Sequence, residues 1–241
     1  MLEPERSQRS RLWPALAVVL GVAAAVALGQ WQLGRGAQKK QLQAQYEAQS
    51  AQPAIHVGAE RLRAADVDLR RPVEARGIFE PRYAVFIDNR IHHGVPGYYV
   101  MMPLHIEHSA LYVLVNRGWI ARQAYRTELP AVRTPTDPVT IRGVAMVPRG
   151  RAFELSSDVY EGSIWQNLTI GRYRKRIGID IQPFVLRQDN ALDDGLVRAW
   201  DPPDFGIEKH YGYAFQWFAL AATILVFYVH TRFRRRRAPS A

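Results

Sequence analysis

The chain has 241 residues, no cysteine and a formal net charge of +10. The absence of cysteine excludes disulfides, thiolate metal sites and cysteine nucleophiles. Five arginines follow residue 231, and three arginines stand against two glutamates before residue 12, which leaves +4 of the net charge for the region between them. That excess is too dilute for nucleic-acid binding, which needs clustered basic residues. We therefore expect no nucleic-acid partner.

The first predicted element is a transmembrane helix over residues 12–33. The run holds no charged residue, and about 20 helical residues cross a hydrocarbon layer about 30 Å thick. A cleaved signal peptide is the alternative, because a basic start and the run Ala25-Val26-Ala27 fit that pattern. The length of the run, and Trp13 and Trp31 at its two ends, favour a membrane span.

Small residues in this run also predict a contact with another helix. They recur four apart on one helical face, although an alanine-rich run also produces such spacing by chance. The residues are Ala17, Gly21, Ala25 and Gly29. The helix is expected to continue through residues 38–49, which contain no Gly or Pro, and to end before Pro53.

A mainly-β domain is predicted between the two spans, over residues 34–209. Alternating apolar residues bounded by turn signals indicate short strands, with one helix at 169–178. The strands are expected at 73–79, 84–90, 98–104, 111–120, 139–147, 164–166, 181–188 and 196–200. Because consecutive short strands joined by turns pair in antiparallel fashion, we expect a curled sheet or small barrel.

A second transmembrane helix is predicted over residues 210–230, followed by a basic tail over 231–241. Basic residues flanking a span stay on the cytoplasmic side, so this tail is expected in the cytoplasm. Two spans return the chain to the same side, which places the tail 1–11 in the cytoplasm and the domain outside. The predicted fold class is a membrane protein whose two transmembrane α-helices flank a mainly-β (α+β), antiparallel, barrel-like extracytoplasmic domain. In a bacterium, that domain is periplasmic and the spans lie in the inner membrane.

Histidines in two predicted turns raise the question of a metal site. His92 and His93 lie in one turn, and His105 and His108 in the next. Neighbouring hairpin tips can gather imidazoles for zinc or copper. The alternative, which we favour, is that these are exposed polar turn residues, because zinc sites need three or four well-placed ligands. The lack of cysteine and the four methionines also argue against copper.

A buried apolar strand runs into the sequence Asn-Arg-Gly-Trp at 116–119, in which Arg117 precedes Gly118 and Trp119. Its guanidinium is suited to pairing with an acidic side chain or a substrate carboxylate. Gly118 permits a bulge or a bend. The alternative is a structural corner in which Trp119 covers the core. No motif of a hydrolase, transferase or nucleotide-binding enzyme is present, so an enzyme is not expected.

His210 opens the second span, and Tyr213 and Trp217 share its helical face. An imidazole beside aromatic rings at a membrane boundary suits an axial ligand for a hydrophobic haem. The alternative is that these residues are only interfacial, because all three types are common there. His230 lies 20 residues further along, about 30 Å along a helix, so it cannot share one iron with His210.

Five blocks in chain order resemble the Surfeit locus protein 1 family. They are Leu-Gly-Gln-Trp-Gln-Leu at 28–33 with Arg35 and Lys39, Gly-Tyr and Pro-Leu at 97–104, Val-Asn-Arg-Gly-Trp at 115–119, Trp-Gln-Asn-Leu at 165–168, and His-Tyr-Gly-Tyr-Ala-Phe-Gln-Trp-Phe at 210–218. The resemblance covers nearly the full chain, including the frame of two spans.

The resemblance implies a non-catalytic role in assembling a haem-copper cytochrome c oxidase. Members are thought to handle haem a during its insertion into the large catalytic subunit. This implies that His210 is the iron ligand, with Tyr213, Trp217 and Trp31 around the cofactor. The expected partners are that subunit, the haem a synthesis machinery and the lipid bilayer. The alternative function is a cofactor-free membrane scaffold that stabilises an early oxidase intermediate.

Overall fold

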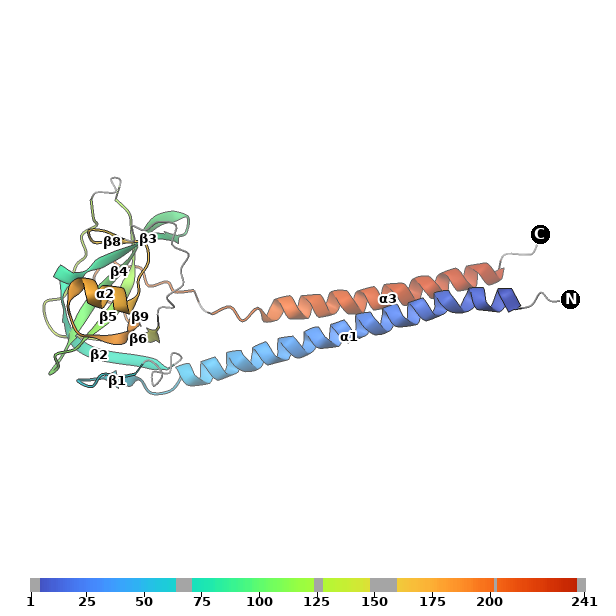
Figure 1. Ribbon diagram of the computed structural model, residues 1–241, viewed down its shortest axis with the longest axis horizontal. Coiled ribbons are helices and arrows are strands. Elements are labelled where there is room, and N and C mark those ends of the chain that lie inside the picture. The colour runs from blue at the N-terminus through green and yellow to red at the C-terminus, as the bar shows by residue number, and fades with distance from the viewer. Residues whose placement is uncertain (1–4, 64–70, 124–127, 148–159, 202, 238–241) are drawn as a thin grey trace. The chain divides into compact units, whose positions relative to one another are not determined.

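The computed structural model describes residues 5–63, 71–123, 128–147, 160–201 and 203–237. These residues fall into two compact units, which we describe separately (Figure 1). The first unit, called the helix pair, comprises Met1–Gln45 and Pro202–Ala241. The second unit, called the barrel domain, comprises Tyr46–Asp201.

The helix pair is formed by α1 (Glu5–Ser50), as far as Gln45, and by α3 (Ile207–Arg237). The two helices run antiparallel and side by side, so that α3 ends where α1 begins (Figure 1). Both are long and apolar enough to cross a membrane, which agrees with the two predicted spans. The predicted continuation of the first helix is also confirmed, because α1 ends at Ser50.

Five strands of the barrel domain close into a barrel. The sheet order runs β2, β6, β9, β5, β4, and a further pairing of β2 with β4 closes the ring. The strands are β2 (Pro72–Phe79), β4 (Val95–Ile106), β5 (Tyr112–Ala121), β6 (Val139–Met146) and β9 (Ile181–Gln188). The predicted mainly-β, barrel-like domain between two apolar helices is therefore confirmed.

Further strands extend the sheet beyond this ring: β1 (Ile55–Val57), β3 (Val85–His92), β7 (Tyr160–Glu161) and β8 (Ile164–Trp165). The 3-10 turn η1 (Pro81–Tyr83) and the helix α2 (Ile170–Ile177) lie outside the sheet. Thr169 caps α2 by accepting from the Arg172 backbone N–H, and Gly178 ends the helix in the left-handed conformation. These two caps explain why α2 matches its predicted position.

Antiparallel pairing holds for the hairpins but not for every pair of strands. Among the described strands, β1 with β2, β3 with β8, and β5 with β9 pair in parallel. Partners in a hairpin must reverse direction, whereas strands joined through long intervening segments are free to run the same way. The turn signals in the sequence report only on hairpins, so these parallel contacts were not predicted.

One predicted strand is wrong. Residues 196–200 form only an isolated bridge between Val197 and Trp119. The segment instead carries two local contacts, because the Leu196 N–H donates to Asp194 and the Trp200 indole donates to the Gln188 carbonyl. The short strands β1 and β7 were not predicted.

The main core fills the barrel. Alternate residues of each strand point inward, as the two-residue period of a strand requires. The inward residues include Val73 and Ala75 of β2, Val113 and Val115 of β5, and Phe184 and Leu186 of β9, all essentially inaccessible to solvent. On β5, Arg117 continues this inward-facing series in the middle of the strand and is completely buried.

Candidate functional site

His210 lies in the first turn of α3 and contacts α1 through a hydrogen bond. Its Nδ1 is 2.8 Å from Oε1 of Gln32, and both side chains are partly buried. Because an amide oxygen can only accept, this contact is a hydrogen bond in the tautomer that carries the proton on Nδ1. The other ring nitrogen, Nε2, then holds a lone pair. Neutral imidazole in this tautomer is the form that ligates a metal through Nε2.

Two glycines of α1 lie one turn on either side of Gln32 and allow α3 to approach closely. A Cβ added to Gly36 would lie 3.3 Å from the Tyr211 ring and 3.6 Å from the His210 Cβ. A Cβ added to Gly29 would lie 2.7 Å from the Phe218 ring, which is too close for any real contact. The hydrogen bond between Gln32 and His210 therefore sits between two points of close helix contact.

The contact between the helices follows a repeat of alternating three- and four-residue steps. This period, 3.5 residues on average, is that of a coiled-coil seam, which keeps one face of each helix against the other. The buried or partly buried positions that follow this repeat include Ala15, Val18, Val22, Ala25, Gly29, Gln32 and Gly36 on α1, and Ile207, His210, Ala214, Trp217, Ala221, Ile224 and Tyr228 on α3. Gly21, Val26 and Phe218 are partly buried beside them.

This repeat corrects the predicted stripe of small residues. Ala25 and Gly29 are buried and Gly21 is partly buried, but Ala17 is exposed. A strict four-residue spacing drifts around the helix, because four residues exceed one turn of 3.6 residues. The prediction was therefore right at Gly21, Ala25 and Gly29 and wrong at Ala17.

The aromatic residues expected around His210 divide into two groups. Trp217 is partly buried and lies seven residues after His210 on the seam. Tyr213 is 54% exposed and Trp31 is 57% exposed, so these rings lie on the outer surface of the helix pair. The structure therefore places Trp217 with His210 against α1, and leaves Tyr213 and Trp31 available to lipid or to a ligand.

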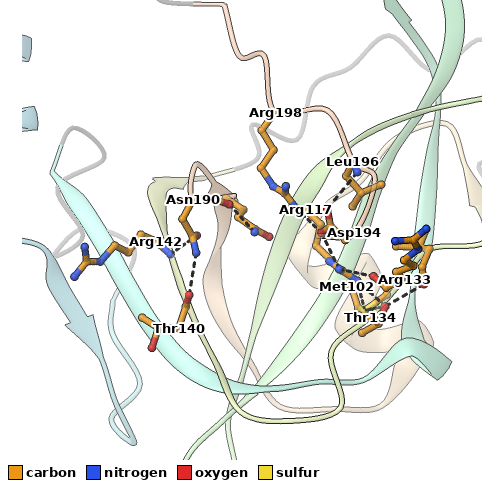
Figure 2. Close-up of polar contacts among 12 residues, drawn as sticks. Met102, Arg117, Arg133, Thr134, Thr140, Arg142, Asn190, Asp194, Leu196 and Arg198 are labelled. Atoms are coloured by element: carbon orange, nitrogen blue, oxygen red, sulfur yellow. Dashed lines mark hydrogen bonds and ion pairs between the residues drawn. The ribbon is translucent and has the colours of Figure 1, made fainter. Parts of the chain in front are cut away.

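A second cluster is centred on Arg117 in the barrel domain (Figure 2). Its guanidinium donates to the Asp194 carboxylate at 2.9 Å, to the Thr134 hydroxyl at 2.7 Å and to the Arg133 carbonyl at 2.9 Å. Its carbon Cζ also lies 4.4 Å from the centre of the Phe79 ring, within the core. The structure thus supplies an acidic protein partner for Arg117, and a substrate carboxylate is not required.

Arg117 is the extra residue of a β-bulge. Gly118 pairs with Val100 of β4, and Asn116 pairs with the next residue, Met101. Arg117 keeps the inward direction of Val113 and Val115, and the bulge shifts the pairing register of the residues that follow it. Burial lowers the pKa of Arg117 below its usual value, and the Asp194 carboxylate opposes that shift. Arginine remains charged at neutral pH, so Arg117 and Asp194 form a buried ion pair.

The histidines of the two turns do not come together in one site. His92 and His93 lie at one end of β4 and His105 near the other, about 30 Å apart at 3.3 Å per strand residue. His105 donates from Nε2 to the Ser109 carbonyl at 2.9 Å and stacks on Tyr112. Within the described part of the chain, no three His, Asp or Glu side chains are grouped to hold a metal ion. Consecutive turns of a meander lie at opposite ends, which explains the separation.

Comparison with known proteins places the chain in a family. The model of the SURF1 family matches residues 19–222. The chain belongs to the SURF1 family.

Similar proteins occur in bacteria and in a mammal. The chain is 26% identical over 219 residues to the SURF1-like protein of Rickettsia bellii, a match that covers 88% of both chains. It is 26% identical over 220 residues to the SURF1-like protein of Rickettsia conorii, covering 88% of this chain and 87% of the relative. It is also 24% identical over 215 residues to Surfeit locus protein 1 of Rattus norvegicus, covering 83% of this chain and 69% of the rat protein.

The blocks that carried the resemblance to the SURF1 family contribute to both clusters. The block at 28–33 supplies Gly29 and Gln32, and the block at 210–218 supplies His210 and Phe218. The block at 115–119 supplies Arg117. These family motifs therefore describe contacts between distant parts of the chain within each unit.

Several residues of these clusters are absent from the predicted site, among them Gln32, Gly36 and Asp194. Gln32 enters the sequence prediction only as part of the block at 28–33. The sequence does contain a signal for Gln32: it is a polar side chain in a span without charged residues. Such groups form hydrogen bonds with other helices inside the membrane. No local pattern marks Asp194, because its partner lies 77 residues away.

Proposed function

We propose that this chain is an assembly factor for a haem-copper cytochrome c oxidase, and that it holds haem a during insertion into the large catalytic subunit. The observation that supports haem handling is the hydrogen bond from His210 Nδ1 to Gln32, which leaves Nε2 as the nitrogen with a lone pair. The link to the oxidase rests on the resemblance to the Surfeit locus protein 1 family.

The residues of the helix pair fit such a cofactor. His210 would hold the haem iron through Nε2, as axial imidazoles do. The exposed rings of Tyr213 and Trp31, together with Trp217, offer apolar surface for the macrocycle. Haem a, when bound, would supply an iron for axial ligation and an isoprenoid tail that partitions into lipid. Apolar side chains on the outer faces of α1 and α3 suit that tail.

The proposal includes a location and a set of partners. The chain would span a bacterial inner membrane twice, with both termini in the cytoplasm and the barrel domain in the periplasm. It would act without catalysing a reaction, in contact with the large oxidase subunit, the haem a synthesis machinery and the lipid bilayer. No nucleic-acid partner is proposed.

A visible spectrum of detergent-purified protein tests the haem proposal. Protein from cells that make haem a is expected to show a Soret band, and His210→Ala is expected to lose it. His230→Ala is the matched control, because His230 is an exposed histidine of α3 about 30 Å from His210 along the helix, and this variant should keep the band. A colourless wild-type protein would refute haem binding. Co-purification with the large subunit from cells lacking haem a would then favour the cofactor-free scaffold.

A further inference from the structure

We propose that Gln32 is a positioning residue for His210, and that it selects the tautomer in which Nδ1 is protonated and Nε2 is free. The role of the free Nε2 as a haem ligand rests on the proposed function, whereas the selection of the tautomer by Gln32 does not depend on it. The observation is the contact of 2.8 Å between Oε1 of Gln32 and Nδ1 of His210, between two helices 178 residues apart in sequence.

The hydrogen bond opposes the intrinsic preference of the ring. An unconstrained neutral imidazole favours the proton on Nε2, which would block that nitrogen as a ligand. An acceptor fixed beside Nδ1 reverses this preference, because which nitrogen is protonated depends on the hydrogen bond that the other one makes. Both side chains are partly buried. This partial burial against the neighbouring helix limits the access of water to both groups, so the pair is favoured.

The helix contacts hold Gln32 in place. Gly29 and Gly36 allow the backbones to approach one turn before and one turn after it, against Phe218 and Tyr211. At both positions a larger side chain would meet an aromatic ring of α3. The amide of Gln32 is therefore set at a fixed height opposite His210, so the hydrogen bond follows from helix packing.

The same hydrogen bond would tune His210 as a ligand. A ligating histidine that donates its other N–H to an oxygen is held in orientation and becomes a stronger base. A neutral amide is a weaker acceptor than a carboxylate, so Gln32 would give intermediate electron donation to the iron. Removing such a supporting partner costs about 10–100-fold in metal affinity in other proteins.

The first test uses the protein without haem. Nuclear magnetic resonance of isotopically labelled histidine, in the full chain and at a pH where imidazoles are neutral, reports which ring nitrogen carries the proton. Wild-type His210 is expected to be protonated at Nδ1. Gln32→Leu should shift the proton to Nε2, whereas Gln32→Glu, which keeps an acceptor oxygen, should not. The control Gln30→Leu changes an exposed glutamine two residues away and should leave His210 unchanged. A wild-type ring protonated at Nε2 would overturn the proposal.

The second test uses haem-loaded protein and measures the midpoint potential of the haem and its retention. Gln32→Leu is expected to raise the potential and weaken haem retention about 10–100-fold. Gln32→Glu is expected to lower the potential, because a carboxylate increases electron donation through the imidazole. Unchanged potentials in both variants would overturn the tuning role. A colourless wild-type protein would instead refute the proposed function, and the tautomer measurement would still decide the role of Gln32.

Discussion

Arg117 and Asp194 form an ion pair inside the barrel domain, with Nη2 and Oδ2 separated by 2.9 Å and both side chains excluded from solvent. The pair joins strand β5 to a loop 77 residues later in the chain. Arg198 also contacts the Asp194 carboxylate from the side nearer the surface. These contacts hold the loop that follows β9 against strand β5 (Figure 2).

Replacing Arg117 by methionine is expected to destabilise the barrel domain strongly. Methionine approximates the length of arginine but leaves the buried Asp194 carboxylate without its main partner. Breaking a buried pair on one side costs about 3–5 kcal/mol. Urea unfolding of the detergent-purified chain, followed by tryptophan fluorescence, measures this loss. Arg133→Met is the control, because that side chain is 79% exposed and its loss should cost less than about 0.5 kcal/mol. Equal stability of the two variants would contradict the role of the buried pair.

Gly118→Ala is expected to destabilise the same region. Gly118 has φ of +142°, and an added Cβ would lie 2.8 Å from the Val197 carbonyl oxygen. Backbone strain of this kind costs about 1–3 kcal/mol. Gly94→Ala is the matched control, since Gly94 also has positive φ but nothing within 4 Å of an added Cβ. The measurement is again the unfolding free energy, and a loss at Gly94 equal to that at Gly118 would show that the contact with Val197 has no cost.

The sequence predicted the elements whose signals are local. Thr169 and Gly178 bracket α2 in the sequence and cap it in the structure. Alternating apolar residues likewise identified the strands that pair as hairpins. The parallel contact of β5 with β9 depends on a long connection, and no short pattern reports it. The isolated bridge at Val197 was mistaken for a strand because a short apolar run fits both descriptions.

The sequence indicated one of the two hydrogen-bonded residues of the candidate site, His210, but not its partner. His210 was recognisable because a histidine at the start of an apolar span is unusual among the surrounding apolar residues. Its partner Gln32 depends on the register between two helices, and that register is set by contacts at Gly29 and Gly36. Nothing within either helix alone fixes this register. The partner of Arg117, Asp194, also depends on a contact between distant parts of the chain, because the two residues are 77 positions apart.

The pairing of α1 with α3 is testable by cross-linking, because the chain has no native cysteine. An added Cβ at Gly21 would lie 3.8 Å from the Ile224 side chain, so the double variant Gly21→Cys, Ile224→Cys should cross-link readily in membranes. Adding Gly29→Ile should reduce the yield, because the side chain would collide with Phe218. Gly34→Ile is the control, since nothing lies within 4 Å of its added Cβ, and the yield should not change. A high yield in the Gly29 variant would refute the tight packing.

The proposed orientation predicts where reporter enzymes are active. Alkaline phosphatase folds into an active form only in the periplasm, because it needs disulfides. It should be inactive when fused after Ala241, which follows the arginine-rich segment. It should be active when inserted at Gly94, in the exposed turn between β3 and β4. A cytoplasmic reporter such as β-galactosidase should give the opposite pattern. Phosphatase activity after Ala241 would overturn the orientation.

The burial of Tyr173 predicts that the free energy of unfolding of the barrel domain falls at alkaline pH. Its side chain is fully buried, and its hydroxyl donates to the Tyr83 carbonyl at 2.6 Å. Burial raises the pKa of Tyr173 well above its usual value, and the nearby Tyr83 adds to the shift. Above about pH 10 the unfolded chain loses this proton while the folded chain keeps it. The unfolded state is then favoured, so this contribution to stability is present below about pH 10 and is lost as the pH rises.

Tyr173→Phe removes both the hydrogen bond and the titrating group. At pH 8 the variant should be less stable than the wild type by about 1 kcal/mol, the usual net value of a hydrogen bond. Between pH 8 and pH 11 the wild type should lose about 1 kcal/mol more than the variant, because one pH unit above the unfolded pKa corresponds to about 1.4 kcal/mol. Urea unfolding at the two pH values measures both differences. The gap between the proteins should therefore narrow or close at high pH, and a gap that stays constant would show that Tyr173 titrates alike in the folded and unfolded states.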